Sequence, residues 1–202
     1  MNTTLKLSAA AAALVVLSSG AAGASVCFLT GTSGDDTLTV PSLPPCDYVI
    51  SGLAGDDTLT GGAGSDKLSP GSPSLVHSGH DTMTGGAGMD TFIIDGSAGS
   101  IGANAQEITD FTHAVDVIYV GSACASHGVT CTFIGCAPFS HTPGEVRYSI
   151  AGGAGYGLLQ IDFDGDAVSD LDVRLDGGPA VNANDVRTAP PPLGRRLKKR
   201  SP

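Results

Sequence analysis

The chain has 202 residues, of which 29 are Gly and 12 are Pro, none is Trp and only 5% are aromatic. So few large apolar side chains exclude a large conventional core, and the predominance of Asp (18 of the 20 acidic residues) favours turns and excludes an all-α protein. Residues 35–187 hold all 20 acidic residues and four basic ones, a net charge of −16. This charge argues against nucleic-acid binding and indicates cations between the carboxylates.

Residues 1–24 predict an export signal. Lys6 gives the amino-terminal region a positive charge, residues 7–17 form an apolar stretch, and the small residues 22–24 allow cleavage after Ala24. The eleven apolar residues are too few to span a bilayer, so a membrane anchor is the weaker interpretation. No other segment predicts a transmembrane helix. We therefore expect a secreted, extracellular protein.

The number of cysteines also fits an oxidising compartment. Their spacing predicts one disulfide between Cys27 and Cys46 and another within the remaining three, Cys124, Cys131 and Cys136. Because the total is odd, one Cys stays free or pairs between chains. A zinc site is the alternative, but the sequence has no CxxC motif and no His spacing to match.

A nine-residue pattern recurs within residues 25–94, where it predicts one structural unit. Each copy has Gly at position four, Asp at position six and an apolar residue at position eight. The copies are residues 31–39 (GTSGDDTLT), 52–60 (GLAGDDTLT), 61–69 (GGAGSDKLS), 76–84 (VHSGHDTMT, degraded) and 85–93 (GGAGMDTFI).

This nonapeptide resembles the calcium-binding repeat of RTX, or haemolysin-type, proteins. Its glycines allow a tight loop with inward carbonyls, its Asp supplies a hard oxygen, and its last three residues form a short strand. Two repeats would complete one turn of a right-handed parallel β-roll, with Ca²⁺ between stacked loops on each side. A flexible Gly/Asp-rich linker is the alternative, but five copies with an apolar eighth position argue against it.

The predicted calcium ligands are the Gly and Asp residues of these loops. Asp residues on one side of an ideal roll would be 18 positions apart, whereas Asp57–Asp81 and Asp66–Asp90 are each separated by 24 because of one insertion, residues 70–75. Asp36 precedes Asp57 by 21, which fits if residues 40–51 form a degraded unit with Ile50 inward. We expect Ca²⁺ between the members of each of these three pairs. The predicted loop ligands are Gly31, Gly34, Asp36, Gly52, Gly55, Asp57, Gly61, Gly62, Gly64, Asp66, Gly79, Asp81, Gly85, Gly86, Gly88 and Asp90.

Residues 95–189 predict antiparallel strands separated by turn residues. Their motifs resemble, in order, those of the C-terminal domain of serralysin-type metalloproteases. The resemblance covers roughly residues 30–187 and implies a β-sandwich-like cap after the roll in an all-β protein. The matching segments are 90–92 (DTF), 108–111 (ITDF), 116–118 (DVI), 144–148 (GEVRY), 162–171 (DFDGDAVSDL) and 181–186 (VNANDV).

Two further metal sites are predicted in this second region. The resemblance implies that Asp110 lies near the last calcium of the roll. A loop with the D-x-D-x-D spacing of calcium sites contains Asp162, Asp164, Asp166 and Asp170. That loop has Ala167 where such sites carry Gly, and Val173 where they carry Glu, so a solvated acidic turn is an equal alternative.

The departures from the serralysin pattern indicate a protein that is not an enzyme. The sequence has neither the HExxH motif of the protease domain nor a GxSxG motif, so no catalytic residue is predicted. The leading hypothesis is a secreted, non-enzymatic calcium-binding protein that folds around Ca²⁺. The alternative is a separated serralysin-like C-terminal domain that assists the secretion, folding or activity of an extracellular metalloprotease.

The carboxyl-terminal residues 190–202 form a Pro-rich and then basic tail. Disorder is the simplest interpretation. Contact with an anionic cell-surface polymer or lipid is a second, and docking onto the acidic body of the chain is a third. The sequence identifies no protein partner.

Overall fold

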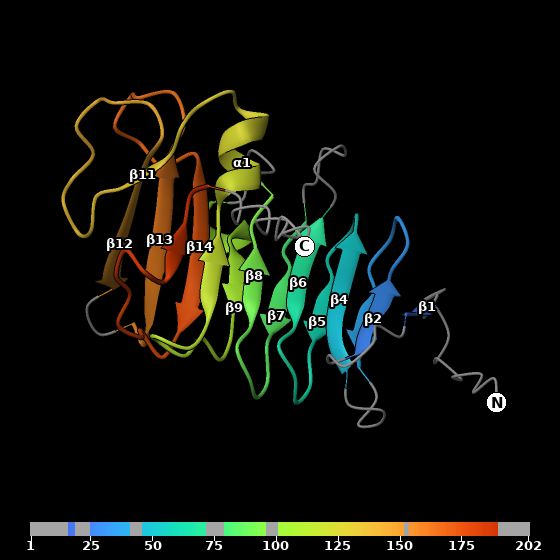
Figure 1. The fold of residues 1–202 in the computed structure, drawn as a ribbon. Helices are drawn as coiled ribbons and strands as arrows, with labels where there is room; N and C mark the ends of the chain where they lie inside the picture. The colour runs from blue at the N-terminus through green and yellow to red at the C-terminus, as the bar shows by residue number, and fades with distance from the viewer. Residues whose placement is uncertain are drawn as a thin grey trace, which may run out of the picture.

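The computed structural model describes residues 16–18, 25–40, 46–71, 79–95, 101–151 and 154–189. Figure 1 shows strands that lie side by side in a long row, from β2 at one end to β12 at the other. Among the described residues the only helical segments are the short α-helix α1 (Gly121–Ser126) and a 3-10 turn, η1 (Gly102–Asn104). The strands form two sheets of seven and eight members.

The first sheet contains alternate strands of the roll. Its order is β1-β2-β4-β6-β8-β10-β15, and every neighbouring pair is parallel except β1 with β2. The strands are β1 (Val16–Ser18), β2 (Ser25–Thr30), β4 (Cys46–Leu53), β6 (Lys67–Gly71), β8 (Thr91–Ile93), β10 (Val117–Tyr119) and β15 (Val186–Arg187).

The second sheet begins in the roll and continues into the cap. Its order is β3-β5-β7-β9-β14-β13-β12-β11; it is parallel from β3 to β14, antiparallel from β14 to β12, and parallel between β12 and β11. The strands are β3 (Thr37–Thr39), β5 (Thr58–Thr60), β7 (Thr82–Thr84), β9 (Gln106–Ile108), β11 (Thr132–Phe133), β12 (Glu145–Ala151), β13 (Tyr156–Asp162) and β14 (Leu171–Asp176).

The core of the roll contains one line of aligned apolar side chains in each sheet, to which the longer strands β2 and β4 add Cys27, Cys46 and Tyr48. The eighth residue of each repeat points inward, and these residues occupy equivalent positions in neighbouring strands of the parallel ladder. Ile50 is also fully buried, as predicted for the degraded unit, and pairs with Leu68. The predicted β-roll with a β-sandwich-like end is therefore confirmed. The aligned core residues are Leu29, Ile50, Leu68, Phe92, Ile118 and Val186 in one sheet and Leu38, Leu59, Met83, Ile108 and Leu175 in the other.

Two disulfides fasten the ends of this assembly. Cys27–Cys46 joins the neighbouring strands β2 and β4, as the spacing predicts. Cys124–Cys131 joins α1 to the segment before β11, which decides the pairing that the sequence left open. The fifth cysteine, Cys136, is free and exposed.

Several predictions concern segments that lie wholly or partly outside the described residues. Of the predicted signal, only residues 16–18 are described, and they form β1. The tail 190–202 and residues 72–75 of the predicted insertion lie outside the description, whereas Pro70 and Gly71 extend β6. Within the described ranges, no helix is both long enough and apolar enough to cross a bilayer.

A substitution in the core line should be far more damaging than one beside it. Leu59→Ala removes a fully buried side chain, and we expect it to lower the free energy of unfolding in excess Ca²⁺ by about 2–5 kcal/mol. Thr58→Ala is the control because Thr58 is exposed on the other face of β5, and its cost should stay below about 1 kcal/mol. Equal losses in urea denaturation would contradict this assignment of faces.

Candidate metal sites

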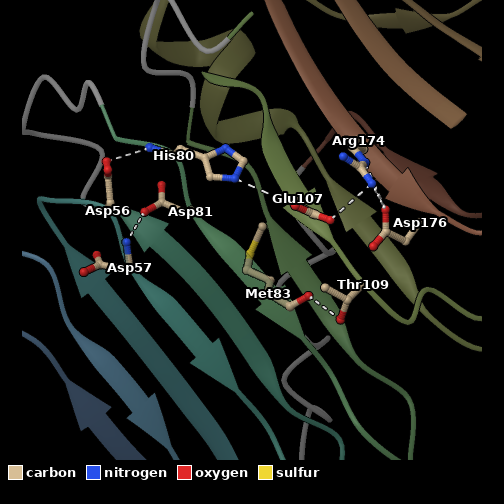
Figure 2. Close-up of polar contacts among 9 residues, drawn as sticks. All are labelled: Asp56, Asp57, His80, Asp81, Met83, Glu107, Thr109, Arg174 and Asp176. Atoms are coloured by element: carbon tan, nitrogen blue, oxygen red, sulfur yellow. Dashed lines mark hydrogen bonds and ion pairs between the residues drawn. The ribbon is translucent and has the colours of Figure 1, made fainter. Parts of the chain in front are cut away.

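Three predicted ligands are stacked on one side of the roll, and we call them the first ladder: Asp36, Asp57 and Asp81. Each directly precedes a strand of the second sheet, and each is at most 2% exposed. The backbone N–H of Asp36 donates to Oδ1 of Asp57 at 2.8 Å, and the N–H of Asp57 donates to Oδ1 of Asp81 at 2.9 Å. Figure 2 shows the contact between Asp57 and Asp81. The structure thus brings together the carboxylates of the first two predicted pairs.

The opposite side carries a second ladder, formed by Asp66, Asp90 and Asp116. The N–H of Asp66 donates to Oδ1 of Asp90 at 2.8 Å, and the N–H of Asp90 donates to Oδ1 of Asp116 at 2.9 Å. Asp116 was not predicted as a ligand, although it directly precedes β10 just as the sixth residue of each repeat precedes its strand. At 5% exposure it is buried like the other members. The N–H of Tyr48 continues this ladder by donating to Oδ1 of Asp66.

Carboxylates next to the ladders join the outer parts of the loops. Oδ1 of Asp35 accepts from the N–H of Asp56, and Oδ1 of Asp56 accepts from the N–H of His80. Oδ1 of Asp47 likewise accepts a hydrogen bond from the N–H of Ser65. None of these three Asp residues was among the predicted calcium ligands. Because they are less buried than the ladder residues, their hydrogen bonds hold the stacked loops together at the solvent side.

Several predicted glycines stand where oxygen atoms converge. A Cβ on Gly31, Gly52 or Gly61 would lie closer than 3.0 Å to the carboxylate of its own repeat and to a carbonyl oxygen of a neighbouring turn of the roll. Gly85 faces the Asp90 carboxylate in the same way. A larger residue at these positions would fill the space toward which the oxygens point. The glycines that face backbone carbonyls of neighbouring loops are Gly55, Gly64, Gly79, Gly86 and Gly88.

The remaining two glycines have other surroundings. Gly62 would meet the side chain of Val40, and Gly34 has open space where a Cβ would be. The N–H of Gly62 donates to Oδ2 of Asp66 at 2.7 Å. At these two positions the structure gives no steric evidence for converging oxygens.

The ladders also contain buried oxygens that fit a hard cation. Oδ1 of Asp36 and Oδ2 of Asp90 are buried and have no hydrogen-bond partner among the described residues. An unsatisfied buried carboxylate oxygen is costly unless a cation or a donor reaches it. Calcium takes six to eight such oxygens from carboxylates and backbone carbonyls in flexible geometry. The donor set of the loops therefore fits Ca²⁺.

Asp110 lies against the last nonapeptide loop. Its two carboxylate oxygens accept hydrogen bonds from the N–H groups of Gly85 and Gly86, each at 2.8 Å. The resemblance implied a position near the end of the roll, and Asp110 is held there by the backbone of the loop.

The acidic loop of the cap forms a compact cluster. Oxygens of Asp162, Asp164 and Asp166 all lie within 4.8 Å of one another. The buried Asp162 accepts hydrogen bonds from the N–H groups of Gly165 and Ala167, while Asp170 accepts from the N–H of Phe163. The Asp170 carboxylate therefore joins the two ends of the loop through its hydrogen bond with Phe163. Ala167 adopts a φ of 69°, the left-handed conformation for which such loops normally carry Gly.

A family model described as peptidase M10 serralysin C terminal matches residues 12–187. The chain belongs to this family. No curated protein matches the chain. Two solved structures from the Azotobacter vinelandii mannuronan C5-epimerase share the fold of this serralysin-type domain. Its AlgE6R3 subunit has a TM-score of 0.56 and 24% identity over 79% of this chain and 81% of that chain. Its AlgE6R2 subunit has a TM-score of 0.54 and 24% identity over 81% and 94%.

Burial disturbs the ionisation of two ladder residues in this serralysin-type domain. It raises the pKa of Asp81 to about 7 and that of Asp90 to about 6. Hydrogen bonds from the backbone oppose these shifts, but nearby carboxylates add to them; Asp57 and Asp95 act on Asp81. Without a cation the folded domain therefore retains protons that an unfolded chain would release.

A row of charged side chains runs across the second sheet from the roll into the cap. Figure 2 shows it: His80 Nε2 lies 3.8 Å from Glu107, and the Arg174 guanidinium lies 3.7 Å from Glu107 and 2.8 Å from Asp176. Burial, followed by a hydrogen bond with Asp176, raises the pKa of Glu107. Because these groups are partly exposed, each pair contributes at most about 1 kcal/mol, and we assign the row a structural role.

The pKa values predict how the stability of the ion-free domain depends on pH. An unfolded Asp ionises near 3.8, whereas Asp81 and Asp90 ionise at about 7 and about 6 when folded. In chelator, the free energy of unfolding should therefore fall as pH rises between about 4 and 7, because the folded state binds these protons more tightly. Urea unfolding across this range measures it. The Asp81→Asn/Asp90→Asn variant should show a flatter dependence, and an equally steep one would contradict these assignments.

The left-handed residue of the cap loop gives a second prediction. Ala167→Gly should raise the stability of the protein by about 1 kcal/mol, because Gly adopts a φ of 69° without steric cost. Thermal unfolding measures the change. Val168→Gly is the matched control: this neighbour is exposed and has no positive φ, so glycine there should be neutral or destabilising. A loss of stability in Ala167→Gly would show that the loop conformation is different.

Proposed function

We propose that this serralysin-type domain is a secreted, non-enzymatic calcium-binding protein whose RTX repeats fold around Ca²⁺. The observation that carries the proposal is the pair of buried carboxylate ladders. In each ladder, the backbone N–H of one Asp donates a hydrogen bond to the carboxylate of the next, so that buried carboxylates are stacked in successive turns. A divalent cation between the loops would neutralise this charge and supply the missing partners of the buried oxygens.

The proposed ions lie between successive loops of one side. Each would take the Asp carboxylates of two stacked repeats, together with carbonyl oxygens from the glycine-containing turns. The pairs are Asp36–Asp57 and Asp57–Asp81 in the first ladder and Asp66–Asp90 in the second. Asp116 adds a carboxylate below Asp90, where Asp110 also contacts the loop. The Asp162–Asp164–Asp166 cluster is the candidate for a separate ion in the cap.

Calcium would act on this protein as a folding ligand. Ion binding favours the state in which the loops are stacked, so the free energy of binding becomes free energy of folding. Extracellular calcium modules bind with dissociation constants of about 10⁻⁴–10⁻³ M. A chain that leaves the cell would therefore become rigid where free Ca²⁺ is high. The predicted export signal and the two disulfides support this location.

The family match favours one further candidate function. Because the matching model describes the C terminus of peptidases, the chain is also a candidate for a separated domain that assists an extracellular metalloprotease. Mixing the calcium-loaded protein with an isolated protease domain of the serralysin type tests this. Restored or stabilised protease activity would support it, and unchanged activity would leave the calcium-binding role alone.

Calcium should convert the protein from a marginally stable, partly formed β-sheet structure into the fully folded one. Far-ultraviolet circular dichroism after chelation should show a cooperative gain of β signal on adding Ca²⁺ and little gain with Mg²⁺. Asp57→Asn should raise the calcium midpoint by about tenfold or more, because Asp57 is shared by two proposed sites and ligand charge sets affinity.

Asp176→Asn is the matched control for this titration. Asp176 pairs with Arg174 on the cap and belongs to neither ladder, so its calcium midpoint should equal that of the wild type. A full β signal in chelator that does not change with Ca²⁺ would contradict the proposed function.

A further inference from the structure

The first ladder does not end at Asp81. Thr82 pairs with Glu107 in the parallel ladder between β7 and β9, so the residue that follows Asp81 in the stack is Gln106. The carbonyl oxygen of Asp81 accepts a hydrogen bond from the N–H of Glu107 at 2.8 Å, which fixes this register. Along β9, Gln106 and Ile108 are buried while Glu107 is outward, so the Gln106 side chain lies on the inner face with the ladder carboxylates.

The Gln106 amide is buried without partners. Its side chain is 0% exposed, and neither Oε1 nor Nε2 has a hydrogen-bond partner in the described chain. A buried amide without hydrogen-bond partners destabilises the folded state, and it is unusual at a regular strand position. The cost is removed if a ligand inside the roll meets this amide.

Negative charge surrounds the same position. Asp81 is 2% exposed and Asp95, which follows β8, is 5% exposed, and the two carboxylates repel one another. Described side chains bring no Lys or Arg into hydrogen-bonding contact with Asp81, and the neighbouring His80 pairs with Glu107 on the outer face. Asp81 therefore has the Asp95 carboxylate near enough to repel it and the Gln106 amide next to it in the stack. A cation stabilises such buried carboxylates.

We propose that Asp81, Asp95 and the Oε1 atom of Gln106 hold a divalent cation, which takes calcium in the extracellular setting, at the junction between roll and cap. This site differs from the loop–loop sites because an uncharged amide replaces one carboxylate. Its position also matters: β9 pairs with β7 of the roll on one edge and with β14 of the cap on the other. An ion here therefore couples calcium binding in the roll to the packing of the cap.

The inference rests on the proposed calcium binding, and variants of Gln106 separate the two. Gln106→Leu keeps the approximate volume and removes the amide. We expect it to bind one Ca²⁺ fewer per chain than the wild type in equilibrium dialysis with atomic absorption. In chelator, Gln106→Leu should be at least as stable as the wild type, because no polar group is left unpaired; in calcium, the order should reverse. A merely structural amide would change stability in the same direction under both conditions.

Gln106→Glu provides a second arm if the leucine variant does not fold. The two side chains are isosteric, so the added charge should make this variant less stable in chelator and fill its junction site at a lower free calcium concentration. Gln160→Leu is the matched control, since Gln160 bonds with Arg147 and Asp172 in the cap and should leave the ion count unchanged.

The outcomes are distinct. Loss of one ion and reversal of the stability order in Gln106→Leu support the junction site. An unchanged ion count in Gln106→Leu, or an unchanged calcium affinity in Gln106→Glu, overturns it while the loop–loop sites stand. A wild-type protein that binds no calcium overturns the proposed function and this site with it.

Discussion

Repulsion between stacked carboxylates is the interaction on which this structure depends. Each turn of the roll places a buried Asp on top of another, so that Asp57 contacts both Asp36 and Asp81 through backbone N–H groups. Parallel strands about 4.8 Å apart require this stacking, because equivalent residues of successive turns must lie side by side. The fold cannot separate the charges without breaking the sheets. In the proposed function, a cation between the loops would resolve the conflict, in the space that the glycines leave open.

The narrow core explains why the loops matter so much for stability. The three-residue strands β3, β5 and β7 each contribute one inward apolar residue, such as Leu59 or Met83, and their other positions are Thr. A domain with so little apolar burial per residue gains less from the hydrophobic effect than an ordinary globular protein of this size. The proposed ion binding at the turns would supply free energy that the core lacks. The disulfides and the larger apolar side chains of the cap, including Phe163 and Leu171, stabilise the other regions.

The second sheet is the physical connection between roll and cap. It continues without a break from β3 to β11, and β9 stands at the change from short parallel strands to long antiparallel ones. Gln106 lies on the inner face of β9, and Glu107 lies on the outer face within the charged row that reaches Arg174. The outer face of this short strand thus carries ion pairs that span the junction, and its inner face carries the unpaired amide of the proposed site.

The sequence by itself determined the repeat unit, its inward residues, the β-roll and the family. A nonapeptide carries its own loop and strand, so Gly, Asp and Leu at fixed positions are enough to predict them. Only the tertiary structure decided the residues brought together by register across irregular connections. Asp116 lies beneath Asp90 although 26 positions separate them. Gln106 is stacked next to Asp81 although it lies beyond the last repeat of the sequence. Cys131, and not Cys136, reaches Cys124, and Ala167 adopts a glycine-like conformation. The reason is that strand pairing aligns residues in space, and the length of a connecting segment does not reveal that alignment.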